Sequence, residues 1–209
     1  MTDAPMTFVC GMRGMGKSTR VKELLRSRRR VVVFDPMGEY AKAGFRRVEW
    51  SDIGGVLKRA GRSKGFKISY VPRANARPDA LHRLSLGLIE FQQAVRGERI
   101  LLVVEEMSFS FPSEKLPAHL WGFKEMCLTG RHSDIEVIGI FQRPALVSTT
   151  FTGNCEDRYI FRLDEAADLD RIAKTIRREN VPQLAALGPH EYLRYHLGKI
   201  TRGKNSLKK

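Results

Sequence analysis

Short apolar runs recur along the chain and are separated by longer amphipathic stretches. Most of the runs are rich in β-branched or aromatic residues and are apolar at nearly every position. We expect strands at Thr7–Cys10, Arg30–Asp35, Lys67–Val71, Arg99–Val104, Glu136–Phe141 and Arg158–Leu163. Continuous apolar strands predict a mostly parallel sheet that is covered on both faces. Tyr192–His196 is expected to be a last strand at one edge of this sheet.

The amphipathic stretches between the runs predict helices. In the longest stretch, Leu81, Leu84, Leu88 and Phe91 fall on one helical stripe. The expected helices are one that ends near Ser27, then Ser51–Ala60, Pro78–Arg96, Pro117 to about Arg131, and Glu165–Arg178. Strands that alternate with helices indicate an α/β fold with helices on both faces of the sheet. No linker divides the chain, so we expect one domain over residues 1–198 and a basic tail over 199–209.

Composition narrows the class of protein. A hydrophobic fraction of 42% in 209 residues is typical of a globular domain. No apolar run approaches the ~18 residues that a membrane-spanning helix needs, so we expect no transmembrane segment. Cys10, Cys127 and Cys155 are far apart in the sequence, which favours neither a disulfide framework nor a zinc site.

The charge is strongly basic. Lysine and arginine number 37 against 23 acidic residues, which gives a formal net charge of +14. The excess gathers in three runs, Arg26–Arg30, Lys58–Lys67 and Lys199–Lys209. One such run alone is often only a solvated surface, but three of them favour a nucleic-acid partner. Our candidates for DNA contact are Lys58, Arg59, Arg62, Lys64 and Lys67.

One motif carries most of the chemical information. The segment GMRGMGKST fits the phosphate-binding pattern G-x-x-x-x-G-K-[ST], and it lies between an expected strand and an expected helix. Its backbone N–H groups would face phosphate oxygens, while Lys17 would reach the β- and γ-phosphates and Ser18 would hold Mg²⁺. We therefore expect ATP and Mg²⁺ to bind, with contacts from Gly11, Arg13, Gly14, Met15, Gly16, Lys17, Ser18 and Thr19.

Polar residues also follow two of the buried strands. Glu105 and Glu106 come directly after Arg99–Val104, at the sheet edge where an open α/β sheet binds its ligand. Glu105 is expected to order Mg²⁺ through water and Glu106 to polarise the attacking water. Gln142 follows Glu136–Phe141 and is expected to contact the γ-phosphate or that water. The alternatives are surface glutamates and an ordinary loop amide.

Together these segments resemble a known family. GMRGMGKST, VVVFDPMGEY, RILLVVEEM and GRHSDIEVIGIFQRP are similar to the FtsK–HerA superfamily of ring-forming DNA translocases. They look most like its small viral branch, the genome-packaging ATPases of tailless, membrane-containing icosahedral phages. The segment from Asp35 to Tyr40 resembles the second-strand motif of that family. The resemblance implies a P-loop NTPase fold of the RecA-like, or ASCE, type.

The resemblance also implies partners. Arg131 would act in trans as an arginine finger on the ATP of a neighbouring subunit, which requires a homo-oligomeric ring, usually a hexamer. The alternative is that Arg131 only caps the carbonyls at the end of its helix. Double-stranded DNA would be the substrate of translocation, and capsid-vertex or packaging proteins would be further partners. The protein would work in the cytoplasm of an infected cell, or at a virion vertex. Met107–Lys115, which contains Phe109 and Phe111, is a candidate interface or coupling loop.

Other readings of the same motifs stay open. A host or plasmid translocase of the HerA/FtsK type shares them, and so does a phage morphogenesis or export ATPase, although the latter normally carries a transmembrane helix. A nucleotide kinase also begins with a phosphate loop, but it places its acid-bearing strand beside the first strand. We take a further strand at Lys67–Val71 and the tandem acids as features of a hydrolytic motor.

Overall fold

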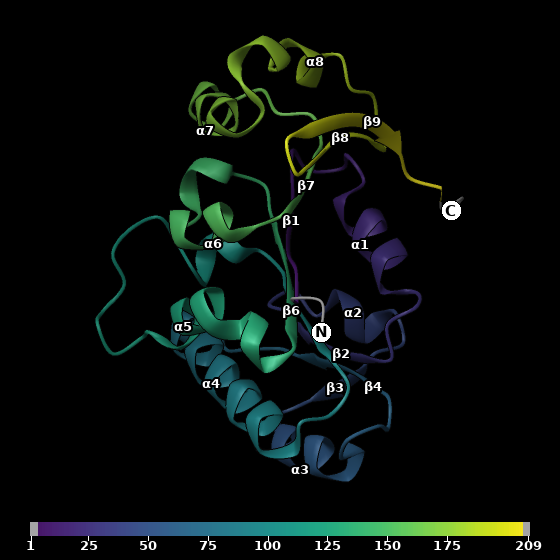
Figure 1. Cartoon of the computed structure of the whole chain (residues 1–209), viewed down its shortest axis with the longest axis vertical. Coiled ribbons are helices and arrows are strands. Elements are labelled where there is room, and N and C mark those ends of the chain that lie inside the picture. Colours follow the sequence, from purple (N-terminus) through teal and green to yellow (C-terminus); the bar gives the residue numbers. More distant parts are fainter. Residues whose placement is uncertain (1–3, 207–209) are drawn as a thin grey trace.

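A computed structural model describes residues 4–206, apart from the side chain of Arg131, and it contains a nine-stranded sheet (Figure 1). The strand order is β3-β4-β2-β5-β6-β1-β7-β8-β9, and the pairs from β3 to β7 are parallel. This confirms the predicted, mostly parallel α/β fold. The strands are β1 (Met6–Cys10), β2 (Arg30–Phe34), β3 (Arg46–Val48), β4 (Phe66–Tyr70), β5 (Ile100–Val104), β6 (Ile135–Phe141), β7 (Asp157–Ile160), β8 (Glu191–His196) and β9 (Lys199–Lys204).

Helices lie on both faces of this sheet. They are α1 (Lys17–Leu25), α2 (Glu39–Lys42), α3 (Trp50–Ala60), α4 (Arg77–Val95), α5 (Gly122–Thr129), α6 (Thr149–Asn154), α7 (Ala166–Ile176) and α8 (Pro182–Ala185). Short 3₁₀ turns occur at η1 (Ala74–Ala76), η2 (Met107–Phe109), η3 (Gly130–Ser133), η4 (Pro144–Leu146) and η5 (Arg178–Asn180). Within the described residues, none of the helices is long and apolar enough to cross a membrane.

Two hydrophobic cores result from the alternation of side chains along the strands. On β1, Phe8 and Cys10 point into the larger core, which α3, α4, α5, α6 and α7 cover. Val9 points to the other face, where it packs with Val21 and Leu25 of α1. The central strands are therefore buried on both sides, as their continuous apolar sequence predicts.

The position of β6 corrects one step of the sequence argument. The strand that separates the acid-bearing β5 from β1 is β6, which pairs with both of them. The run Lys67–Val71, which we expected to supply this additional strand, forms β4 between β3 and β2 instead. β5, which carries Glu105 and Glu106 at its end, is still not paired with β1. The strand between them is β6 rather than the run Lys67–Val71.

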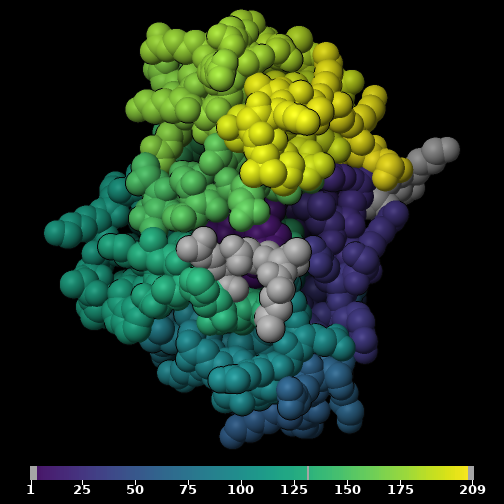
Figure 2. Space-filling view, viewed as in Figure 1, coloured from purple at the N-terminus to yellow at the C-terminus, as the bar shows by residue number. Residues whose placement is uncertain are grey.

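The carboxyl-terminal part of the sheet also differs from expectation. β8 is not an edge strand, because β9 pairs with it in an antiparallel hairpin. Residues 199–204, expected as the start of a basic tail, therefore form a strand, while Lys208 and Lys209 lie outside the described residues. In the space-filling view the yellow residues of this hairpin lie against purple residues of the amino-terminal part (Figure 2).

The helix expected from Pro117 begins later, at Gly122. The His82 ring on α4 accepts a hydrogen bond from Gly122 N–H at 2.8 Å, so a side chain from another helix caps the first turn. A Cβ atom at position 122 would lie 2.5 Å from the His82 carbonyl oxygen, which explains why glycine occupies this close contact. A tertiary contact, rather than the proline, sets where α5 starts.

Candidate functional site

The phosphate loop connects β1 to α1 in the way its sequence predicts. Gly14 and Gly16 adopt φ angles of 80° and 100°, a region that residues with a side chain rarely enter. The loop is tied to the sheet because Met12 N–H donates to Arg162 O at 2.9 Å. No side chain of the described residues caps the first turn of α1. Its N–H groups and the positive end of its dipole are therefore available to an anion.

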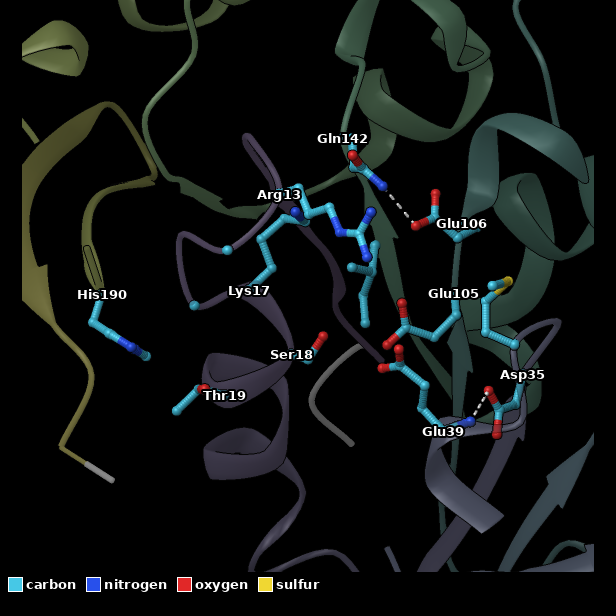
Figure 3. Close-up of a pocket in the computed structure, with 14 residues that line it drawn as sticks. Arg13, Lys17, Ser18, Thr19, Asp35, Glu39, Glu105, Glu106, Gln142 and His190 are labelled. Carbon is cyan, nitrogen blue, oxygen red and sulfur yellow. Dashed lines mark hydrogen bonds between the residues drawn. The ribbon is translucent and has the colours of Figure 1, made fainter. Parts of the chain in front are cut away.

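The cavity in front of this loop has a volume of about 570 Å³, which lies within the range for small-molecule sites (Figure 3). It lies at the carboxyl edge of the sheet. Three segments that were predicted for the site meet there, namely the phosphate loop, Glu105–Glu106 and Gln142, together with residues that were not predicted. The lining residues are Arg13, Gly14, Gly16, Lys17, Ser18, Thr19, Asp35, Met37, Glu39, Glu105, Glu106, Ile140, Gln142 and His190. Of the predicted nucleotide contacts, Gly11 and Met15 do not line the cavity, since Gly11 is buried and Met15 packs on the core beside α1.

Lys17 projects from the first turn of α1, and its Nζ donates to Met12 O within the loop at 2.9 Å. Burial lowers the pKa of this ammonium group, while the carboxylates of Glu106 and Glu105 act in the opposite direction. The lysine is thus a cation held between the loop and two acids. Such a cation can move from a backbone carbonyl to a phosphate oxygen without leaving the cavity.

Glu105 is the first residue after β5 and is only 8% exposed. Burial raises its pKa to about 7, and the neighbouring Glu106 adds to this shift, whereas the Tyr40 hydroxyl opposes it. Its Oε1 is buried and accepts no hydrogen bond from the described residues. A buried carboxylate oxygen that lacks a donor suits a hydrated cation.

The arrangement therefore fits Mg²⁺ held mainly by water. Mg²⁺ commonly keeps several waters and binds through few protein ligands together with substrate phosphates. The Ser18 hydroxyl and, through water, Glu105 are the groups that would hold it.

Glu106 is in the left-handed region, with φ 47° and ψ 50°. Its Oε1 accepts a hydrogen bond of 2.8 Å from Gln142 Nε2. β5 and β6 are neighbouring parallel strands with Val104 opposite Gly139, so the two residues leave the sheet at the same edge. The structure thus brings together the acid and the amide that the sequence placed on separate strands.

The sequence identified Asp35 and Glu39 only as members of a segment that resembles a family motif, and not as site residues. Asp35 is fully buried and accepts hydrogen bonds from Glu39 N–H (3.0 Å), Tyr40 N–H (2.9 Å) and Ser69 Oγ (2.8 Å). These bonds fix the start of α2 at the end of β2. Glu39 consequently lines the cavity on the same side as Glu105 (Figure 3).

The sequence did not predict His190 as a site residue. It precedes β8 and lines the cavity on the side away from Glu106 and Gln142 (Figure 3). A lone histidine before an expected edge strand carries no local signal of a site. Only the pairing of β8 with β7, which itself lies beside β1, brings it to the phosphate loop.

The remaining predicted residues lie elsewhere. Arg131 belongs to η3, ahead of β6, and its side chain lies outside the described residues. Phe111, in the segment expected to be a coupling loop, is buried. Phe109 of the same segment is 59% exposed, with the Arg77 guanidinium over its ring.

The three basic runs differ in the structure. Arg30 of the first run is buried and donates to the carbonyls of Gly61, Arg62 and Glu98, so it stabilises the fold. The second run is exposed, and within the described chain it makes no ion pair. We call it the α3–β4 basic patch; its residues are Lys58, Arg59, Arg62, Lys64 and Lys67. Because Lys67 is near the start of β4, this patch approaches the edge of the sheet opposite the cavity.

Comparison with known proteins supports the fold. No protein-family model and no curated protein matches the sequence. The genome packaging NTPase B204 of Sulfolobus turreted icosahedral virus 2, in complex with ATP-gammaS, is similar with a TM-score of 0.78 and 20% identity, over 99% of this chain and 100% of that chain. B204 of Sulfolobus turreted icosahedral virus, a DNA-packaging ATPase, has a TM-score of 0.74 and 20% identity, over 98% of both chains.

A second kind of protein shares this architecture. VirB4 of Thermoanaerobacter pseudethanolicus has a TM-score of 0.71 and 13% identity, over 99% of this chain and 90% of that chain. These likenesses confirm the predicted α/β fold, which this chain shares with the genome packaging NTPase B204 and with VirB4.

Proposed function

We propose that this protein hydrolyses ATP and uses the free energy to move double-stranded DNA into a viral capsid. The observation that carries the ATPase part is the convergence of the phosphate loop, Glu105, Glu106 and Gln142 on one cavity. Three separate segments, from β1, β5 and β6, supply these groups at the edge of the sheet where ligands bind. The reaction would be attack of water on the γ-phosphate.

Each residue has a distinct role in this proposal. The loop N–H groups and Lys17 bind the phosphates. Ser18 and, through water, Glu105 would hold Mg²⁺, which would supply positive charge against the charge that develops on the phosphates. Glu106 accepts the proton of the attacking water, and its hydrogen bond to Gln142 fixes the direction in which the carboxylate faces. Gln142 is placed to exchange this bond for one to the γ-phosphate or the water.

Arg131 fits a role on a neighbouring subunit. It precedes β6, whereas Gln142 follows it, so the seven residues of the strand separate them. At roughly 3.3 Å per residue, this separation is about 20 Å, which exceeds the reach of an arginine side chain. The ATP on which Arg131 acts therefore belongs to another copy in a ring. A hexamer is our expectation from the family resemblance.

The DNA part of the proposal rests on charge and on the fold. The net charge of +14 and the exposed α3–β4 basic patch suit a polyanion bound without regard to sequence. The fold is shared with proteins described as genome-packaging or DNA-packaging enzymes. The expected setting is the infected cell, with a capsid vertex as the docking partner.

The test is the rate of ATP hydrolysis with and without double-stranded DNA. We expect the unaltered protein to hydrolyse ATP faster when DNA is present, and Lys17→Ala to be inactive in both conditions. A rate that DNA does not change would remove the translocase part of the proposal. Activity in Lys17→Ala equal to that of the unaltered protein would remove the assignment of the site.

One alternative has an observation in its favour. The similarity to VirB4, a bacterial protein, over almost the whole of both chains favours the host- or plasmid-type translocase that the motifs also allow. Both candidates require ATP and share the site, so the distinction lies in the partner. Co-sedimentation of the protein with empty capsids from infected cells supports packaging. Its absence from capsids, with DNA-stimulated hydrolysis intact, supports the alternative.

A further inference from the structure

The cavity has two chemically different ends, with the phosphate loop between them (Figure 3). Glu106 and Gln142 lie at one end, where the terminal phosphate must react. His190 lies at the other end. A triphosphate that follows the loop with its γ-phosphate beside Glu106 must extend its nucleoside in the opposite direction. The geometry therefore directs the nucleoside toward His190.

His190 is held in place by backbone contacts on both sides. Its N–H donates to Met15 O at 2.9 Å, and its carbonyl accepts from Asn205 N–H at 3.0 Å. The residue has φ 66°, a left-handed conformation that is uncommon outside glycine. Such a conformation persists where the surroundings determine it. The imidazole is thus fixed relative to the phosphate loop.

Gly16 makes this close approach possible. A Cβ atom at position 16 would lie 2.6 Å from His190 Nδ1 and 2.8 Å from Asn205 Nδ2. In its place, the Asn205 amide donates to Gly16 O at 2.8 Å and lies 3.3 Å from His190 Nδ1. The open end of the β8–β9 hairpin, formed by His190 and Asn205, is therefore docked on the loop.

We propose that His190 forms the nucleobase subsite of this cavity, with the heterocyclic base of the nucleotide packed on the imidazole ring. The inference rests on the proposed function, since it requires a nucleoside triphosphate on the phosphate loop. Asn205 is a positioning residue, because it contacts the loop and the imidazole rather than the base. The subsite makes the carboxyl-terminal hairpin part of the nucleotide site. His190 is 174 positions after Gly16 in the sequence.

The test compares two ligands that differ only in the nucleoside. Binding of ATP and of inorganic tripolyphosphate is measured by calorimetry in the presence of Mg²⁺. His190→Ala should weaken ATP binding roughly tenfold, the scale of losing one base–aromatic contact, and leave tripolyphosphate binding unchanged. His190→Phe, which keeps a flat ring, should bind ATP within about threefold of the unaltered protein. Unchanged tripolyphosphate binding also shows that the loop is still folded.

His119→Ala is the matched control, because this histidine is exposed in the loop before α5, and it should change neither affinity. Equal weakening of both ligands by His190→Ala would overturn the subsite, as would unchanged ATP affinity. A loss of ATP affinity in His190→Phe as large as the loss in His190→Ala would also overturn the subsite. An unaltered protein that binds neither ligand would instead overturn the proposed function, and the subsite with it.

Discussion

The Gln142 amide donates to Glu106 Oε1 at 2.8 Å, so the residue that follows β6 holds the carboxylate that follows β5. The bond uses one of the two carboxylate oxygens and fixes its orientation in the cavity. A base that must accept a proton from water works best when it is held in this way. The pair is therefore where we expect hydrolysis, rather than binding, to be decided.

Glu106→Gln should bind ATP and fail to hydrolyse it. An amide cannot accept the proton of water, and the loss of a general base typically lowers the rate 10²- to 10⁴-fold. ATP affinity and hydrolysis are measured separately, with Glu105→Gln as the comparison, for which we expect a higher Mg²⁺ requirement. Normal turnover in Glu106→Gln, with none in Glu105→Gln, would reverse the two roles.

Glu105 should make stability depend on pH in metal-free buffer. Its folded pKa is about 7 against an ordinary value of 4.5, so between these values the folded protein retains a proton that the unfolded chain releases. Stability should therefore fall as pH rises through this window. The free energy of unfolding of Glu105→Gln should exceed that of the unaltered protein by about 3 kcal/mol at pH 8. The difference should become progressively smaller toward pH 4.5. Urea unfolding measures both, and the exposed Glu114→Gln should show no such dependence.

Arg131→Ala should bind ATP but hydrolyse it slowly, by a factor on the order of 10³. Its own phosphate loop is intact, and only the charge supplied to the neighbouring site is lost. Mixing Arg131→Ala with Glu106→Gln should restore part of the activity, because some interfaces then pair an intact Arg131 with an intact Glu106. No recovery in a mixture that co-assembles by sizing would argue against a shared site.

Neutralising the α3–β4 basic patch should reduce the salt dependence of DNA binding. Each phosphate contact contributes about 0.9 to the slope of log affinity against log salt. Affinity is measured over a salt series by fluorescence anisotropy. The control neutralises Lys174, Arg177 and Arg178, which lie on or beside α7 at the other end of the molecule (Figure 1). If the control lowers the slope and the patch variant does not, the contact lies near α7.

Asp168 should support catalysis from outside the cavity. It is 1% exposed and accepts hydrogen bonds from Arg143 Nε and from Ala145 N–H at 2.9 Å, which fixes the loop after Gln142. Asp168→Asn should cost about 1–3 kcal/mol of stability and lower the hydrolysis rate more than ATP affinity. Asp164→Asn, at an exposed pair with Arg162, is the control for both measurements. A loss of affinity equal to the loss of rate would indicate only damage to the fold.

The buried strands and the phosphate loop were predictable because local sequence determines them. The run Ile100–Val104 is apolar at every position, and a buried strand is the state that satisfies it. The motif around Lys17 fixes both a backbone shape and a chemistry. Glu106 and Gln142 could be placed at one edge because parallel strands share their carboxyl ends. Their mutual hydrogen bond could not be predicted, because it depends on β5 and β6 being neighbours.

The errors have a common cause in contacts between distant residues. The start of α5 depends on the hydrogen bond from Gly122 N–H to the His82 ring. Residues 199–204 form β9 because they pair with the free edge of β8. Likewise, the basic run at Arg26–Arg30 gave no sign that Arg30 is buried against three carbonyls. His190 is the most important site residue that the sequence did not predict. Its spatial neighbour Gly16 lies near the other end of the sequence.

The pairing of β1 has a consequence for biosynthesis. β1 is the first of the described strands to leave the ribosome, yet its partners are residues near Val137 in β6 and Asp157 in β7. It must wait for more than half of the chain, since the strands made in between, β2 to β5, pair elsewhere. During this interval an apolar strand has no partner, and parallel pairing at long range is intrinsically slow. A nascent chain that stops before β6 has the phosphate-loop sequence without the sheet that shapes it.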